Sequence, residues 1–312
     1  DVDLTGTIAQ GAGIRTITAT AGTASNIDIS GTTAGITVTT NAGNDTVTAG
    51  SGADDISTGA ADDTVQFLSA NFTSADTVDG STGDDTIQIT NDANGSAGAA
   101  IVDADFTNVT DVETLLLSGT GAQDVDLTGT IAQGAGIRTI TATAGTASNI
   151  DISGTTAGIT VTTNAGNDTV TAGSGADDIS TGAADDTVQF LSANFTSADT
   201  VDGSTGDDTI QITNDANSTT GRAPIVDADF TNVTDVETLL LSGAGAQDVD
   251  LTGTIAEGAG IRTITATAGT ASNIDISGTT AGITVTTNAG NDTVTAGSGA
   301  DDISTGANND LI

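Results

Sequence analysis

Three consecutive nine-residue units between residues 40 and 68 constrain the fold of this chain most strongly. Each unit carries an Asp and, two positions later, a small aliphatic residue. The three pairs are Asp45 and Val47, Asp54 and Ile56, and Asp63 and Val65. Three such units at one fixed spacing, separated by Gly-containing turns, are not expected by chance. They predict an array of identical short strands and turns.

Elementary chemistry explains why these residue types recur at this spacing. In a short strand, side chains alternate between two faces, so the aliphatic residue can enter a core. Gly at positions such as Gly43 and Gly52 allows a left-handed backbone and a close approach of carbonyl groups to an ion. Carboxylate and carbonyl oxygens are the ligands that Ca²⁺ prefers, and the chain has 39 Asp but no His or Cys.

The units resemble the G-G-x-G-x-D-x-U-x nonapeptide of the RTX family. The middle unit, A-G-S-G-A-D-D-I-S, matches every family position except the first Gly. The resemblance implies an all-β fold, a right-handed parallel β-solenoid of the β-roll type. It also implies multiple bound Ca²⁺ ions. The resemblance covers the Asp-containing coils of each repeat and not the coils around Ile27 and Ile36, which have aliphatic residues where the family has Asp.

The implied metal ligands are the Asp residues two positions before an aliphatic residue. Coils of two nonapeptides would place Asp45, Asp63 and Asp85 along one edge and Asp54 and Asp76 along the other. The full predicted set is Asp45, Asp54, Asp63, Asp76, Asp85, Asp168, Asp177, Asp186, Asp199, Asp208, Asp292, Asp301 and Asp310. The alternative is that these Asp residues only stabilise turns. The neighbouring Asp55 is expected to be solvated.

A long internal repeat organises the whole chain. The phrase that begins DVDLTGTIAQ at residue 1 returns at 124 and 248, so residues 1–123, 124–247 and 248–312 are two near-identical repeats and a partial third. We expect one continuous solenoid that is a window of a longer chain. The segment 95–100 differs in length from its counterpart 218–224, which predicts an exposed loop.

Strands are predicted wherever Thr and aliphatic residues alternate between Gly, Asn, Asp or Ser turns. The alternation has no helical periodicity, and the long irregular segment 91–111 leaves two alternatives open, a loop or a helical turn. Ile29, Val38, Val47, Ile56 and Val65 share one nine-residue spacing, which predicts a common register. In the first repeat the predicted strands are 2–4, 14–19, 27–29, 36–39, 46–48, 55–57, 64–67, 77–79, 86–89 and 113–117.

Composition limits the possible functions. The net charge is −38, with four Arg and no Lys, which excludes nucleic acid as a partner and disfavours anionic membranes. No apolar run is long enough to span a bilayer. Disorder is expected for such an acidic chain without Ca²⁺, because like charges stacked a few ångström apart repel by about 1 kcal/mol each.

The residue types present disfavour several specific functions. The chain has no His for general-base catalysis and few aromatic residues for a sugar platform, so we expect no enzyme activity. Pairs such as Thr37 and Thr39 fit outward strand positions better than an ice-binding face. The array and the recurring phrase NVTDVETLLLSG (108–119 and 232–243) resemble bacterial S-layer proteins and large repetitive RTX adhesins.

This second resemblance implies a secreted, calcium-stabilised structural protein that assembles with itself into a surface layer or biofilm matrix fibre. A stalk of a secreted adhesin and, less favoured, the secretion module of an exoenzyme stay open. The expected partners are further copies of the chain, end to end or side by side, and a cell-surface polysaccharide. The expected location is the surface or surroundings of a Gram-negative bacterium, after type I secretion.

Overall fold

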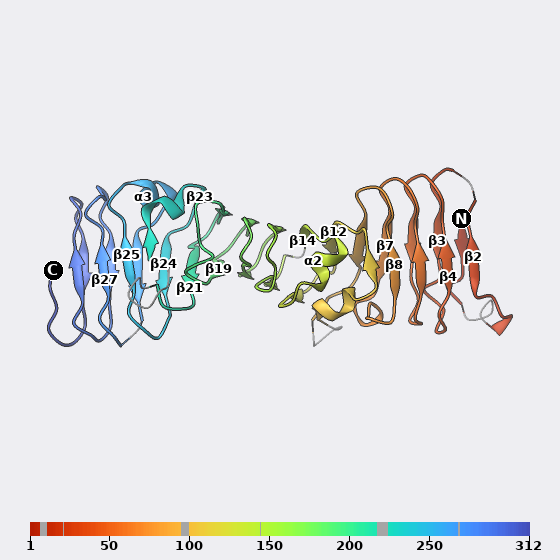
Figure 1. The fold of residues 1–312 in the computed structure, drawn as a ribbon, viewed down its shortest axis with the longest axis horizontal. Helices are drawn as coiled ribbons and strands as arrows, with labels where there is room; N and C mark the ends of the chain where they lie inside the picture. Colours follow the sequence, from red (N-terminus) through yellow and green to blue (C-terminus); the bar gives the residue numbers. More distant parts are fainter. Residues whose placement is uncertain (7–10, 21, 95–99, 144, 217–223, 268) are drawn as a thin grey trace. The chain divides into compact units, whose positions relative to one another are not determined.

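Short parallel strands joined by turns make up most of the regular structure (Figure 1). The computed structural model describes residues 1–6, 11–20, 22–94, 100–143, 145–216, 224–267 and 269–312. These residues form two compact units, and each is described separately. Unit 1 comprises Asp1–Thr155 and Ile159–Thr163, and unit 2 comprises Thr156–Gly158 and Asn164–Ile312.

Unit 1 contains three parallel sheets. The first sheet consists, in order, of β1 (Val2–Asp3), β3 (Asn26–Asp28), β5 (Thr46–Thr48), β7 (Thr64–Phe67), β9 (Thr86–Ile89), β12 (Thr114–Leu117), β14 (Thr139–Ala142) and β16 (Thr160–Thr162). The second sheet consists of β2 (Thr16–Thr18), β4 (Thr37–Thr39), β6 (Asp55–Ser57), β8 (Thr77–Asp79) and β11 (Val109–Thr110). The third sheet consists of β10 (Ile101–Val102), β13 (Asp124–Asp126) and β15 (Asn149–Asp151).

Unit 2 repeats this arrangement. One sheet consists of β17 (Thr169–Thr171), β19 (Thr187–Phe190), β21 (Thr209–Ile212), β24 (Thr238–Leu241), β26 (Thr263–Ala266), β28 (Thr284–Thr286) and β30 (Asp302–Ser304). A second consists of β18 (Asp178–Ser180), β20 (Thr200–Asp202) and β23 (Val233–Thr234). A third consists of β22 (Ile225–Val226), β25 (Asp248–Asp250), β27 (Asn273–Asp275) and β29 (Thr293–Thr295).

The order of the strands defines a parallel β-solenoid, because successive strands along the chain alternate between facing sheets. One coil therefore contains one strand from each of two sheets, and each strand pairs with its counterpart in the next coil. Thr46, for example, lies opposite Thr64, and Thr64 lies opposite Thr86. The all-β solenoid predicted from the nonapeptides is confirmed. Its right-handed sense and its continuity across the repeats stay predictions.

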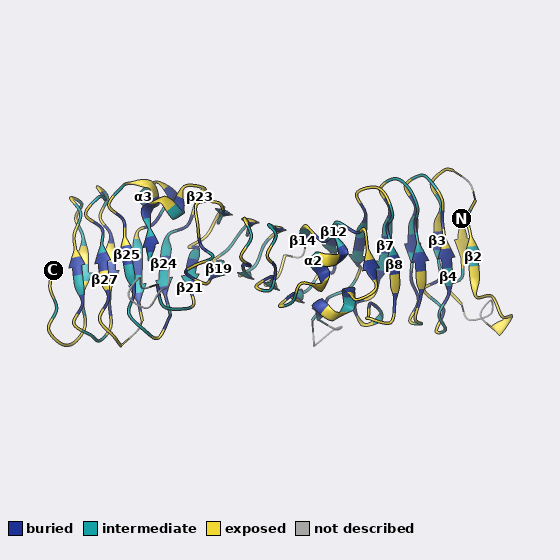
Figure 2. Cartoon of the chain, viewed as in Figure 1, coloured by how far each residue is buried: buried dark blue, intermediate teal, exposed yellow. Residues whose placement is uncertain are grey.

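The core is a column of mainly aliphatic residues from successive strands, and four-residue strands such as β7 and β9 bury two residues each. In the first sheet Ile27, Val47, Val65, Ile87 and Leu115 lie opposite one another in register, and all are buried. Figure 2 shows buried positions, in dark blue, along the strands. The Thr residues on either side point outward, as the alternation predicts.

The expected register of the first coils was wrong. Ile29 is buried, but the strand partner of Val47 is Ile27, so this coil contains 20 residues and not 18. The turn between β4 and β5 is short, whereas the chain from β3 to β4 takes two more residues. The residue at the Asp position of this coil is consequently Ser25.

Aligned Thr residues form one outward row along the first sheet of unit 1. The row consists of Thr46, Thr64, Thr86, Thr114, Thr139 and Thr160, which are paired in register. The parallel row two residues later is mixed, with Thr48, Gln66 and Gln88 joined by side-chain hydrogen bonds of 3.0 and 2.9 Å. These ladders stabilise the outer face of the sheet.

In each repeat, the sheet that faces the first sheet ends and another sheet takes its place. We call this exchange the wall change. Along the chain, β10 and β11 follow β9 and precede β12. In the sheets, β11 is the last strand of the second sheet and β10 is the first strand of the third. As a result, β3 of the first repeat lies in the first sheet, but its counterpart β15 lies in the third. Unit 2 shows the same exchange at β22 and β23. Equivalent residues of neighbouring repeats therefore lie on different walls.

Short helices and aromatic side chains fill this change of wall. A helical turn within 91–111 was one of two alternatives left open by the sequence, whereas the other helices and the role of the aromatic residues were not predicted. The helices are η1 (Ser69–Asn71), η2 (Asp103–Phe106) and α2 (Ile131–Ala135) in unit 1, and η4 (Asp227–Phe230) and α3 (Ile255–Ala259) in unit 2. Phe72 contacts both Phe67 and Phe106, with ring centroids 5.1 Å apart in each pair. Asp103 accepts hydrogen bonds from the amides of Ile131 and Ala132 and so fixes α2 to the preceding coil.

The length-variable loop predicted at 95–100 and 218–224 lies almost wholly outside the described residues. No helix in the described part of the chain has the length and apolar character needed to cross a bilayer.

Replacing Phe106 and Phe230 together with Ala should destabilise each wall change by about 3–5 kcal/mol, because each substitution leaves a large cavity in a closed core. Denaturant unfolding in saturating Ca²⁺ would measure the loss. The matched control is Leu68→Ala with Leu191→Ala, since these side chains are 50% and 48% exposed. Equal losses in the two variants would contradict the assigned core.

Candidate metal centre

The structure gathers the predicted Asp residues into buried rows at the corners of the coils. Eleven of them are buried, and Asp301 and Asp310 are partly exposed. Each Asp except Asp310 precedes a strand by one residue, so its side chain lies on the same side as the core residue two positions later. The rows follow the edges predicted from the spacing.

Row 1 of unit 1 lies beside the first sheet and contains Asp45, Asp63 and Asp85. Oδ1 of Asp63 accepts a hydrogen bond from the amide of Asp45, at 2.7 Å, and Oδ1 of Asp85 accepts one from the amide of Asp63, at 2.9 Å. Oδ1 of Asp45 accepts the amide of Ser25. Each carboxylate therefore joins its own coil to the preceding coil.

Row 2 of unit 1 lies beside the second sheet and contains Asp54 and Asp76. The amide of Asp54 donates to Oδ1 of Asp76, at 3.0 Å, and the amide of Ile36 donates to Oδ1 of Asp54, at 2.9 Å. Their second oxygens also accept hydrogen bonds, from the amides of Gly50 and Thr73 respectively. Both oxygens in row 2 are thus bound to backbone donors.

The second oxygens of row 1 are in a different state. Oδ2 of Asp45 and Asp85 is buried and has no hydrogen-bond partner, and the same holds for Asp208, the counterpart of Asp85 in unit 2. A buried acceptor without a donor is costly, and a bound cation would remove that cost. Row 1 consequently fits a hard cation better than row 2 does.

The other repeats form equivalent rows. In unit 2 the amide of Asp168 donates to Asp186, the amide of Asp186 to Asp208, and the amide of Asp177 to Asp199. In the partial third repeat the amide of Asp292 donates to Asp310, and the amide of Ile283 donates to Asp301. All thirteen predicted ligands therefore lie in rows of this type, and their binding of Ca²⁺ stays a prediction.

Burial disfavours the charged form of these carboxyl groups. Desolvation, partly offset by backbone hydrogen bonds, raises the pKa of Asp54, Asp85 and Asp208 to about 6. The same cause raises the pKa of Asp63 and Asp76. Neighbouring carboxylates add repulsion, for example Asp63 and Glu113 acting on Asp85.

Among the described residues, no three acidic side chains converge on a single point in a way that could hold a metal ion. Any ion in these rows must then take backbone carbonyl oxygens as well, which suits Ca²⁺ with its six to eight oxygen ligands. Gly residues in the turns allow the backbone carbonyl groups of the neighbouring coil to approach closely. A Cβ at Gly59 would lie 2.0 Å from the carbonyl oxygen of Asn41, and Gly59 has φ +98°.

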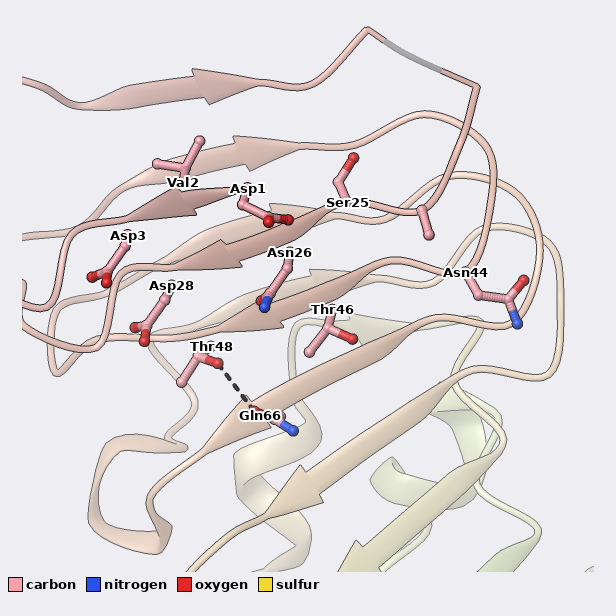
Figure 3. Close-up of a pocket in the computed structure, with 11 residues that line it drawn as sticks. Asp1, Val2, Asp3, Ser25, Asn26, Asp28, Asn44, Thr46, Thr48 and Gln66 are labelled. Atoms are coloured by element: carbon pink, nitrogen blue, oxygen red, sulfur yellow. Dashed lines mark hydrogen bonds between the residues drawn. The ribbon is translucent and has the colours of Figure 1, made fainter.

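A separate hollow lies on the outer face of the first sheet (Figure 3). It is lined mainly by polar side chains of β1, β3, β5 and β7, including Asp3, Asp28, Asn26 and Gln66, and it is distinct from the buried Asp rows. Neither an aromatic nor a basic residue lines it. The hollow is an acidic groove on the strand surface.

Sequence reasoning missed Glu113 and Glu237. Glu113 occupies the row 1 position of the next coil and accepts a hydrogen bond from the amide of Asp85, at 2.8 Å; Glu237 does the same for Asp208. The signal was present, because Glu113-Thr114-Leu115 has the same pattern as Asp85-Thr86-Ile87.

Asp63→Asn should lower Ca²⁺ affinity by about tenfold, or about 1.4 kcal/mol, since it removes a buried negative charge from row 1. Asp55→Asn is the matched control, because Asp55 is the exposed neighbour of a row residue. Calorimetric titration of Ca²⁺ would measure both affinities. A stronger effect from Asp55→Asn would contradict the assignment of the rows.

Without Ca²⁺, the chain should be more stable at pH 5.0 than at pH 7.5. The folded chain binds protons more tightly at Asp54, Asp85 and Asp208, whose ordinary pKa is 3.8. Their contribution to stability is fully present below about pH 3.8 and is lost as the pH rises through about 6.

With Ca²⁺ bound the sign should reverse, because protons compete with the cation for the same carboxylates. Far-ultraviolet circular dichroism during urea unfolding at both pH values, with and without Ca²⁺, checks the two signs. A calcium-free chain that is more stable at pH 7.5 would contradict the pKa directions.

Comparison with known proteins supports the same interpretation. The family model described as RTX calcium-binding nonapeptide repeat (4 copies) matches residues 34–65, 72–88, 157–188, 195–211 and 281–312. All thirteen predicted Asp ligands lie within these segments. No curated protein and no solved structure shows significant similarity to the chain.

RTX repeats bind calcium, and they are typical of proteins that Gram-negative bacteria export by type I secretion. The matched segments coincide with the coils that carry the buried Asp rows, and these coils stack as a parallel β-solenoid. The chain is an RTX-type β-roll repeat protein.

Proposed function

We propose that this chain is part of an extracellular structural protein that Ca²⁺ stabilises and that assembles with itself into a surface layer or a biofilm matrix fibre. The observation that carries the proposal is the repetition of the site. Each full repeat rebuilds the same two Asp rows and the same strand ladders with almost no change of sequence. Such repetition stacks many copies of one structural unit, and a rod or a lattice is built in this way.

The energetics support a role for Ca²⁺ as a folding switch. The rows bring carboxylates of consecutive coils to the spacing of paired strands, about 4.8 Å. The electrostatic repulsion between these carboxylates is strong, because the chain has a net charge of −38 and no Lys to offset it. Export of an unfolded, calcium-free chain followed by folding outside the cell is consistent with these charges.

A structural role is favoured over an enzymatic one. The groove in Figure 3 is acidic and has neither aromatic platform nor basic group among its lining residues. The buried carboxylates are bound to backbone amides of the adjacent coil and so are committed to holding the coils together. We propose that the chain has no catalytic activity.

Self-association is the proposed mode of assembly. Parallel ladders have the same pattern of backbone donors and acceptors on every rung, so a further coil of the same kind can pair with a free rung. Association through side faces is the other route. A cell-surface polysaccharide is proposed as a second partner, and the location is the surface or the matrix of a Gram-negative bacterium.

The stalk of a secreted RTX adhesin is the second candidate. A solenoid of repeated coils favours this function too, because a rod can separate an adhesive domain from the cell. The secretion module of an exoenzyme is less favoured, since near-identical tandem repeats exceed what a module of that kind needs.

Titration of Ca²⁺ into the chelator-treated chain, followed by circular dichroism and analytical ultracentrifugation, separates these candidates. We expect the β signal and species larger than a monomer to arise together at sub-millimolar to millimolar Ca²⁺. A β signal with a chain that stays monomeric at high concentration would contradict self-assembly and favour the stalk.

A further inference from the structure

Glu113 extends row 1 beyond the nonapeptides. The strand β12 that follows it pairs in register with β9, with Thr114 opposite Thr86. Oε2 of Glu113 accepts a hydrogen bond from the amide of Asp85, just as Oδ1 of Asp85 accepts one from the amide of Asp63. Glu113 lies outside every segment that the nonapeptide family model matches.

The coil at Glu113 is shifted slightly out of the regular pattern. The amides of both Glu113 and Thr114 donate to the carbonyl oxygen of Asp85, at 3.1 and 3.0 Å. In the regular coils the carbonyl oxygen of a row residue accepts the amide of the Thr that begins the next strand, as Asp63 does from Thr86. A longer side chain at this position suits the shift, because it still reaches the amide of the preceding coil.

Next to Glu113, an unpartnered oxygen of Asp85 packs closely against Gly80. Asp85 is 2% exposed, and its Oδ2 is buried without a hydrogen-bond partner. The position of a Cβ on Gly80 would be 2.6 Å from this Oδ2 and 2.0 Å from the carbonyl oxygen of Asp111. A carboxylate oxygen and a carbonyl oxygen therefore converge in the space that a side chain at residue 80 would fill.

The regular rungs differ at the equivalent position, five residues before the Asp. There the chain has Thr, and in the third repeat the hydroxyl of Thr287 donates to Oδ2 of Asp292, at 2.7 Å. Gly80 has no such hydroxyl to offer Asp85. Thr at this position does not always satisfy the carboxylate, because the hydroxyl of Thr40 donates to the carbonyl oxygen of Thr58 and Oδ2 of Asp45 has no partner. At the end of row 1 no hydroxyl is present at residue 80, and Oδ2 of Asp85 has no partner either.

Unit 2 reproduces each of these features. The amide of Asp208 donates to Oε2 of Glu237, at 2.8 Å, and Oδ2 of Asp208 is buried without a partner. A Cβ on Gly203 would lie 2.7 Å from that Oδ2 and 2.0 Å from the carbonyl oxygen of Asp235. Asp111 and Asp235 both have φ +52°, so the same strained turn presents the carbonyl in the two units.

The next residue along the row is basic. Arg138 follows Glu113 in the ladder, because its amide donates to the carbonyl oxygen of Glu113, at 2.9 Å. Its guanidinium donates to the carbonyl oxygens of Gln133 and Ile137, at 2.9 and 2.6 Å. The acidic row therefore ends at Glu113, and the Arg side chain is bound to the end of α2.

We propose that Asp85, Glu113 and the carbonyl oxygen of Asp111 form a Ca²⁺ site that closes row 1, and that Asp208, Glu237 and the carbonyl oxygen of Asp235 form its counterpart. All these ligands are oxygens, which selects a hard divalent cation over zinc or copper. The site joins the last nonapeptide coil to the wall change. It rests on the Ca²⁺ binding of the proposed function but lies outside the nonapeptides.

The test is the number of Ca²⁺ ions bound per chain, measured by equilibrium dialysis and atomic emission. The variant is Glu113→Gln with Glu237→Gln in the full chain. Gln keeps an oxygen that can accept the amide of Asp85 or Asp208, while it loses the charge that a cation requires. We expect two fewer ions per chain than in the wild type, and one fewer in each single variant.

Glu257→Gln is the matched control. Glu257 is partly exposed and accepts hydrogen bonds from Thr280. The second repeat has Gln133 at the same position, so the repeat tolerates this change. The control should bind as many ions as the wild type. Circular dichroism in Ca²⁺ would confirm that each variant folds. If the double variant does not fold, the single variants, which each keep one intact site, still give the ion count.

Two outcomes would overturn the proposal, and they are distinguishable. A wild-type chain that binds Ca²⁺ and a folded Glu variant that binds the same number would remove this site alone and leave the proposed function standing. A wild-type chain that binds no Ca²⁺ would remove both.

Discussion

The close stacking of buried carboxylates is the constraint on which the rest of this structure depends. Each Asp of row 1 gives one oxygen to the amide of the preceding coil, so the rows hold the coils in register. The same geometry brings negative charges together out of water, where repulsion and desolvation act in one direction. A cation bound to the second oxygen would resolve this conflict by neutralising the row. Under the proposed function, folding and Ca²⁺ binding are one process.

Two features allow a chain without an aromatic-rich globular core to hold this geometry. Small aliphatic residues such as Val47 and Val65 stack in a narrow column, and outward Thr residues form a ladder on the strand surface. At the wall change the column is too wide for Val or Ile alone, and Phe67, Phe72 and Phe106 fill it. The few Phe residues of the chain are thus concentrated where the solenoid departs from its regular coil.

The sequence was sufficient to predict the regular coils, because period and chemistry agreed there. The spacing of Asp45 and Asp63 predicted a row, and the structure joins these residues by a hydrogen bond. It was insufficient where coils have unequal lengths. The two extra residues between β3 and β4 moved the strand partner of Val47 from Ile29 to Ile27. The wall change depends on long-range pairing of two-residue strands, for which no local pattern exists. Glu113 was missed because only Asp was sought at the ligand position.

Hydrogen exchange of the row amides, followed by mass spectrometry with and without Ca²⁺, tests the central claim most directly. The amides of Asp45, Asp63 and Asp54 donate to carboxylates of the next coil. If cation binding holds the rows together, peptides that contain these amides should be strongly protected in Ca²⁺ and should lose most of that protection in chelator at pH 7.5. Equal protection in both conditions would mean that the rows are stable without a cation, and would contradict the account.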